Sequence, residues 1–193
     1  MLRGLWSSIE WRASMNLYTL RNKQGLLIVV ALGLGGCGGM PKNAEEFRQF
    51  TLERTRVLGT LSVPKETFEV ERPFRDVSST LQKKADECLK VAIKWTVTNS
   101  YGNTRSGVDT FKPTFITGPN KAELHVQLKR SAVVELGAPP DGSYRVVLDA
   151  TPLAAKRTRI EMYAMSIDDK LVRQTLRGWA QGTNLGCPDL AKR

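Results

Sequence analysis

The sequence predicts an α+β fold, in which an antiparallel β-meander sheet of about five or six strands carries two amphipathic helices on one face. Between residues 123 and 164, apolar and polar side chains alternate in segments separated by short turns, which is typical of consecutive antiparallel strands. Before and after the strand-rich region, apolar residues recur at three- and four-residue steps, as on one face of a helix. One sheet would bury both helical stripes, so residues 64–193 are predicted to form a single α+β domain.

The first elements of this domain are a strand and a helix. Residues 67–71 alternate between polar and apolar side chains and predict a strand. Pro73 then opens a helix, because the amide hydrogen that proline lacks would have no partner in a first helical turn. The predicted buried stripe of this helix consists of Phe74, Val77, Leu81, Ala85, Cys88 and Leu89.

The middle of the chain is rich in β-branched and aromatic residues. Residues 92–98 predict a strand and residues 99–103 a turn. Residues 110–117 predict the next strand, which Pro113 restricts to a sheet edge or a bulge. The remaining strands are expected at residues 123–134, 144–150 and 157–164.

The second helix is predicted over residues 168–180. Ser166 and Asp169 ahead of it resemble a capping box, with Asp in place of the usual Glu or Gln. Its apolar stripe consists of Leu171, Val172, Leu176 and Trp179.

The N-terminal region has the layout of an export signal. Arg21 and Lys23 precede an uncharged run over residues 25–36, which is about half of the roughly 20 residues that a membrane-spanning helix needs. The run ends in Leu34-Gly35-Gly36-Cys37, which resembles the lipobox of a bacterial lipoprotein signal peptide. The resemblance implies a signal peptide over residues 1–36 (with Met15 as its true start), cleavage before Cys37, and lipidation of that cysteine.

The same resemblance implies a place in the bacterial envelope. Gly38 follows Cys37 where an Asp would be expected for retention in the inner membrane, so the protein is expected at the outer membrane, facing the periplasm. Residues 37–63 would form a lipidated tether with a short helix over residues 43–56. Two alternatives remain open, namely an ordinary cysteine in a glycine-rich linker and an uncleaved membrane anchor.

With Cys37 lipidated, Cys88 and Cys187 remain as an even pair in an exported chain. Oxidising compartments favour a disulfide between them, which would enclose about 99 residues. The alternative is two buried free thiols. A redox-active pair is disfavoured because the two cysteines do not form a CxxC motif.

The chemical inventory predicts no enzyme. With three cysteines and one histidine, a zinc site made of Cys and His clusters is nearly excluded, and no GxSxG, P-loop or HExxH motif occurs. No catalytic residue, metal or cofactor is therefore expected. His125 is expected on the polar, solvent-facing side of its strand.

The remaining functional signal is a basic surplus of 29 Lys and Arg over 19 Asp and Glu. Such groups could bind anionic lipid headgroups, lipopolysaccharide phosphates or acidic wall polymers, whereas a solvated surface of mixed charge is the alternative. Nucleic acid is not an expected partner of an envelope domain. The candidate anion-binding residues are Lys156, Arg157, Arg159, Arg173 and Arg177.

The element order is similar to the helix-grip plan, which occurs in domains of a lipoprotein of the outer-membrane barrel-assembly complex and in small ligand-binding folds. The similarity is one of order alone, so it says little about function. The leading hypothesis is a non-enzymatic envelope lipoprotein that binds a protein partner or an anionic envelope component. The alternative is a small-molecule or lipid carrier, with a cavity between the sheet and the C-terminal helix under residues 171–179.

Overall fold

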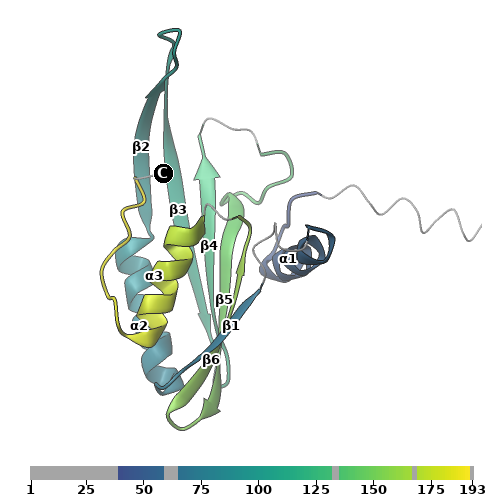
Figure 1. Cartoon of the computed structure of the whole chain (residues 1–193), viewed down its shortest axis with the longest axis vertical. Helices are drawn as coiled ribbons and strands as arrows, with labels where there is room; N and C mark the ends of the chain where they lie inside the picture. The colour runs from purple at the N-terminus through teal and green to yellow at the C-terminus, as the bar shows by residue number, and fades with distance from the viewer. Residues whose placement is uncertain (1–38, 59–64, 132–134, 167–168, 192–193) are drawn as a thin grey trace, which may run out of the picture. The chain divides into compact units, whose positions relative to one another are not determined.

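Six strands form one antiparallel sheet in the described part of the chain, in the spatial order β1-β6-β5-β4-β3-β2 (Figure 1). Strands β2 to β6 are joined in sequence as a meander, and β1 pairs with β6 at the far edge. The predicted α+β class is confirmed. The strands are β1 Glu66–Val70, β2 Val91–Thr98, β3 Thr104–Thr117, β4 Ala122–Arg130, β5 Ser143–Ala154 and β6 Arg157–Ala164.

The computed structural model describes residues 39–58, 65–131, 135–166 and 169–191. The predicted signal peptide, Cys37 and Asp168 lie outside these residues. The helices within them are α1 Ala44–Leu58, α2 Phe74–Cys88 and α3 Lys170–Gln181. None of the described helices has the length and apolar character required to cross a membrane.

Helices α2 and α3 lie side by side over one face of the sheet, as the sequence predicted (Figure 1). From α3, the side chains of Val172, Leu176 and Trp179 are buried against the sheet, whereas Leu171, predicted on the same stripe, is exposed because it lies beside that stripe and away from the core. The predicted stripe of α2 is buried with them, except Phe74, which packs at its margin. This face therefore holds the main hydrophobic core.

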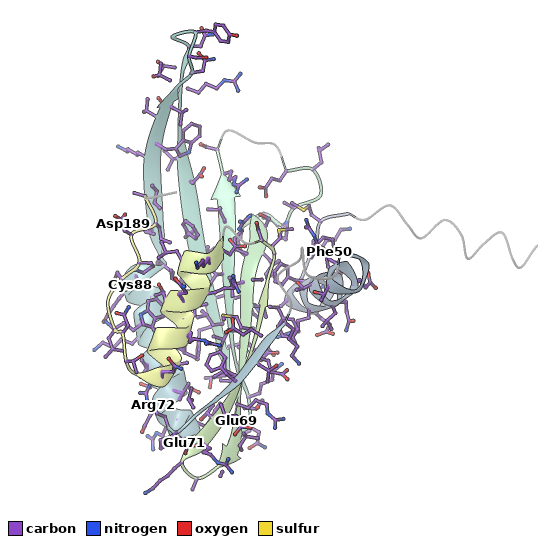
Figure 2. The ribbon with its side chains drawn as sticks, viewed as in Figure 1. Phe50, Glu69, Glu71, Arg72, Cys88 and Asp189 are labelled. Atoms are coloured by element: carbon purple, nitrogen blue, oxygen red, sulfur yellow. A yellow bond between two sulfur atoms is a disulfide. The ribbon has the colours of Figure 1, made fainter. Side chains whose placement is uncertain are left out.

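Arg72 fastens the end of α3 to the start of the domain (Figure 2). Its Nη1 donates hydrogen bonds to the carbonyl oxygens of Trp179 (3.0 Å) and Ala180 (2.9 Å). These carbonyls lie in the last turn of the helix, where the regular backbone pattern ends, and the Trp179 carbonyl also accepts a hydrogen bond from Gly182 N–H at 3.2 Å. Gly182 then ends the helix with φ = 74°, a left-handed conformation that glycine adopts without strain.

The opposite face of the sheet differs from the expectation, which left it open to water. Helix α1 packs there, with Phe47 fully buried against Val147 and Tyr163. The compact unit consequently runs from Gly39 to Arg193, and residues 39–58 are not separate from the domain that the sequence placed at residues 64–193. Few apolar residues make this contact, which is why the sequence pattern did not reveal it.

Strand β3 is longer than predicted, because it begins at Thr104 and not at residue 110. Its first residues are polar and include Gly107, so they carry no apolar alternation. Pro113 lies where β3 has lost its β2 neighbour, since the β2 pairing ends at Phe111. The expectation of an edge position for this proline is confirmed, because no ladder hydrogen bond on that side is lost.

The predicted disulfide between Cys88 and Cys187 is present, with the two Cα atoms 5.1 Å apart. Cys88 is the last residue of α2 and lies three positions before the start of β2 (Figure 2). Three residues beyond Cys187, Leu190 is buried in the main core. The disulfide therefore holds the C-terminal segment at the root of the β2–β3 hairpin.

Candidate functional site

The β2–β3 hairpin extends beyond both helices of the main core (Figure 1). Its root is packed, since Phe111 is buried and Ile93 lies against the same core. Its outer part is exposed on both faces, with 60% of Val97 and 88% of Tyr101 open to solvent. Exposed apolar side chains on a projecting two-stranded ribbon contribute little to folding, so they mark a candidate interaction surface.

The tip of the hairpin is an ordered turn. The side-chain Oδ1 of Asn99 accepts hydrogen bonds from the backbone N–H groups of Tyr101 and Asn103, each at 3.0 Å. Gly102 has φ = 79°, which completes the turn expected over residues 99–103. The turn fixes the position at which the ribbon presents Tyr101.

Trp95 is held against the ribbon itself and is not part of the main core. Its Nε1 donates a hydrogen bond to Oδ1 of Asp109 at 3.1 Å. The indole lies over Gly107, where an added Cβ would come within 2.5 Å of the ring. Gly107 thus provides the space that lets a large aromatic side chain lie on a two-stranded segment.

A groove of mixed apolar and polar lining follows this part of the hairpin, with a volume of about 350 Å³. Leu190 and Ala191 of the C-terminal segment form its other wall, which the disulfide holds in place. This volume lies at the lower end of the roughly 300–1,000 Å³ that is common for ligand pockets. The hairpin side of the groove consists of Ile93, Trp95, Thr96, Val97 and Asp109.

The outer edge of β2 carries no neighbouring strand, since β2 is last in the sheet order. Among the described residues, no backbone hydrogen bond to this edge comes from outside the sheet. Lys90, Lys94 and Arg105 are exposed around it and form no ion pair with any described carboxylate. The edge therefore combines unpaired backbone groups with uncompensated positive charge.

Most of the predicted anion-binding residues lie around β1, on its two faces. On one face Arg157 and Arg159 approach Glu69, at 3.4 and 4.0 Å (Figure 2 labels Glu69). On the other face Arg173 and Arg177 pair with Glu66. These four cations are thus separated into two groups, each already supplied with a carboxylate.

Two further details complete that region. The guanidinium of Arg177, on α3, lies 4.5 Å from the centre of the Phe68 ring, on β1. This cation–π contact also holds the Arg177 side chain against the sheet. Lys156, in the turn between β5 and β6, is exposed and forms no ion pair within the described residues. Sequence reasoning could not see the pairing, because Glu66 and Glu69 are far from these arginines along the chain.

A charge cluster made of the buried Arg48 and Asp149 and the partly exposed Glu123 and Lys121 joins α1 to the sheet. Arg48 Nη2 lies 2.6 Å from Asp149 Oδ1 and also contacts Glu123, while Lys121 Nζ lies 2.9 Å from Glu123. Burial alone would raise the pKa of Glu123, but hydrogen bonds from Arg48, Lys121 and His125 lower it to about 2. Likewise, burial would lower the pKa of Arg48, but Asp149 and Glu123 raise it.

His125 is buried under α1, which corrects the expectation of a solvent-facing histidine. Its Nε2 lies 3.1 Å from Oε2 of Glu123, and its ring meets the Tyr144 ring edge-on with centroids 6.0 Å apart. It lies on the predicted polar side of β4, but α1 covers that side. Within the described residues, no group of three or more His, Cys, Asp or Glu side chains is placed to hold a metal ion.

The space that a carrier would need under α3 is occupied by Val172, Leu176 and Trp179, which are buried in the main core. A hollow of about 390 Å³ lies elsewhere, between the start of α2 and the end of β3. Phe74 and Phe115 line it together with Ser78, whose buried Oγ has no hydrogen-bond partner among the described residues.

Comparisons with known proteins identify no family. No protein-family model matches the chain, and no curated protein does. A solved structure of protein NE0264 from Nitrosomonas europaea is similar over 62% of this chain and 86% of its own, with 14% sequence identity and a TM-score of 0.26. Similarity at this level carries no argument about fold or function.

Proposed function

We propose that this chain is a non-enzymatic lipoprotein of the bacterial envelope, anchored through Cys37, that binds a partner protein with its β2–β3 hairpin. The observation that carries the proposal is the hairpin itself. It extends past the core with Val97 and Tyr101 exposed, and its root is fixed by the disulfide to Cys187. A ribbon that is ordered but not needed to complete the core is suited to contact another molecule.

The proposed anchor would hold the folded body close to the membrane. The lipobox-like residues end at Cys37, and the compact unit begins at Gly39. A chain spans at most about 3.6 Å per residue, so the first residue of the body would lie within about 10 Å of the lipidated cysteine. The hairpin, with a β2 strand about 27 Å long, would then provide the reach toward a partner.

A protein partner is favoured over an anionic lipid or polymer by the distribution of charge. Arg157, Arg159, Arg173 and Arg177 already have carboxylate neighbours on β1, which reduces the attraction they offer to an anion. The exposed apolar surface lies on the hairpin instead. Val172, Leu176 and Trp179 are packed between the sheet and α3, which weighs against the carrier hypothesis.

The proposal is tested by site-specific photo-crosslinking in intact cells of the native host. A photoreactive amino acid at Val97 or Tyr101 should give a discrete crosslinked species of higher mass, identified by mass spectrometry. Glu53, exposed on α1, is the matched control position. Equal crosslinking from Glu53, or none from the hairpin, would contradict the proposed docking surface.

The anchor is tested separately. Replacing Cys37 by serine should abolish labelling by a fatty-acid analogue and leave unprocessed precursor, because serine lacks the thiol that accepts the lipid. Normal processing of this variant would refute the lipobox assignment without affecting the docking surface.

A further inference from the structure

We infer that the partner binds as an extended segment of alternating apolar and acidic residues, which adds to the sheet as a new strand along the outer edge of β2. The inference rests on the proposed function and deepens it, since it names the mode of binding and the chemistry of the partner. It is carried by three features of the same edge, which are the unpaired backbone, the row of Ile93, Trp95 and Val97 along the groove, and the uncompensated lysines.

The backbone of β2 offers the main-chain hydrogen bonds. Its eight residues all pair with β3 in regular antiparallel register, from Val91 with Phe111 to Thr98 with Thr104. A regular strand without a bulge presents alternate N–H and C=O groups on its free side, which is the template that an added strand requires. Cross-strand hydroxyl contacts, Thr96 with Ser106 and Thr98 with Thr104, keep the ribbon in this register.

The groove selects for apolar side chains on one face of the added strand. Along β2, Ile93, Trp95 and Val97 face the groove, and Leu190 forms its opposite wall. Side chains at every second position of an added strand would project to this same face. Alternate apolar residues in the partner would therefore be removed from water, whereas a segment without that period would leave polar groups there.

The charge of the edge selects for acidic residues between them. Lys94 lies on the face of β2 opposite to Ile93, Trp95 and Val97, where the residues between the apolar ones of an added strand would project, and Lys90 precedes the strand. Neither lysine has a carboxylate partner within the described residues, as noted above. Carboxylates on the added strand would compensate the charge of Lys94 and lie near that of Lys90.

The same charges disfavour a second copy of this chain as the occupant. Pairing of two β2 edges would bring Lys94 and its equivalents in the other molecule together without a counter-ion. Lysine on an edge strand is a common means of preventing such self-association. A partner that binds here must therefore bring the negative charge that this chain lacks.

The test uses fluorescence anisotropy of labelled synthetic peptides with the mature, lipidated protein in detergent micelles. The probe is an eight-residue peptide of alternating valine and glutamate. It is compared with a peptide of the same composition in which the residues are grouped in two blocks, and with one carrying lysine in place of glutamate. We expect the alternating acidic peptide to bind at least tenfold more tightly than either control.

Backbone methylation distinguishes strand addition from simple insertion of side chains. Two versions of the probe are N-methylated at either of the two alternating sets of positions. Only the set that faces β2 should abolish binding, because only those N–H groups donate to the edge. Equal behaviour of the two versions, or no binding of the parent peptide at 1 mM, would overturn the inference.

Charge reversal provides the last arm. The double variant Lys90→Glu, Lys94→Glu changes exposed side chains, so its melting temperature should match that of the parent protein. It should bind the lysine peptide at least tenfold better than the glutamate peptide, and an unchanged preference would overturn the role of charge. If crosslinking from Val97 succeeds while the peptide arms fail, the docking surface stands and strand addition falls.

Discussion

The centre of the sheet and its projecting hairpin show how one sheet serves two purposes. In β4 and β5, residues such as Leu124 and Leu148 are fully buried, and both faces of the sheet are covered by helices. Where β2 and β3 leave the core, Val97 and Tyr101 are exposed and no helix covers them. The comparison teaches that stability and the proposed binding surface occupy separate residues, so either can be changed without the other.

The largest expected difference between the two regions comes from truncating an aromatic side chain in each. Trp179→Ala should lower the free energy of unfolding by about 3–5 kcal/mol, because it opens a cavity in the main core. Tyr101→Ala should change it by less than about 0.5 kcal/mol, since the ring is exposed. Chemical denaturation of the two variants measures both values, and similar losses would break the comparison.

The charge cluster under α1 is expected to contribute to the stability of the folded domain, as the core residues do. Arg48→Ala should cost about 3 kcal/mol, because it leaves the buried Asp149 and the partly exposed Glu123 without their main counter-ion. Arg54→Ala, an exposed position on the same helix, is the control and should be close to neutral. Denaturation midpoints decide the matter, and a neutral Arg48→Ala would mean that the contact of α1 with the sheet contributes little.

The same cluster should make the body sensitive to acid. The pKa of Glu123 is lowered from 4.5 to about 2 in the folded protein, so the folded state favours its ionised form. The resulting stabilisation is present above about pH 4.5 and is lost as the pH falls toward 2. Thermal melts across this range should show a steeper loss for the parent protein than for Glu123→Gln, whereas Glu53→Gln should follow the parent.

A modest effect on stability, with a large one on binding, is expected at Gly107. An alanine there would come within 2.5 Å of both the Trp95 ring and Ser131 Oγ, so these side chains must move away. Because the site lies outside the core, we expect Gly107→Ala to cost about 1 kcal/mol or less while it abolishes hairpin crosslinking. Intrinsic fluorescence should report the altered Trp95, since Trp179 stays buried. Retained crosslinking would show that the groove does not need this indole.

Much of the folded domain can be predicted from the periodicity of apolar residues and from the residue types that favour turns. The stripe of α2, the turn at Asn99 and the alternation in β5 and β6 all express local rules that a single sequence carries. The packing of α1 against the sheet does not follow from local rules. It depends on the contacts of Arg48 with Glu123 and Asp149, which are distant in sequence. The burial of His125 has the same cause, since only the packing of α1 covers that side of β4.

The hairpin was the least predictable element, for a related reason. Residues 104–109 contain no apolar alternation, because most of this segment is exposed and its one buried residue is Asp109. The informative signal was the combination of Trp95 with a glycine on the following strand, which becomes meaningful only when the register is known. The predicted basic residues failed to stand out as one site, because β1 supplies their carboxylates.

The pairing of β1 with β6 decides when the molecule can be completed. Glu66 pairs with Met162, so the first strand to leave the ribosome waits for nearly the last one. In a polypeptide that ends before β6, strand β1 would lack its neighbour in the sheet and α2 would lack α3. Cys88 would also lack Cys187, with which it forms the disulfide. Because this pairing joins distant parts of the sequence, it forms slowly and only after β6 has been synthesised. Shorter products could not complete the sheet and would remain open to proteolysis.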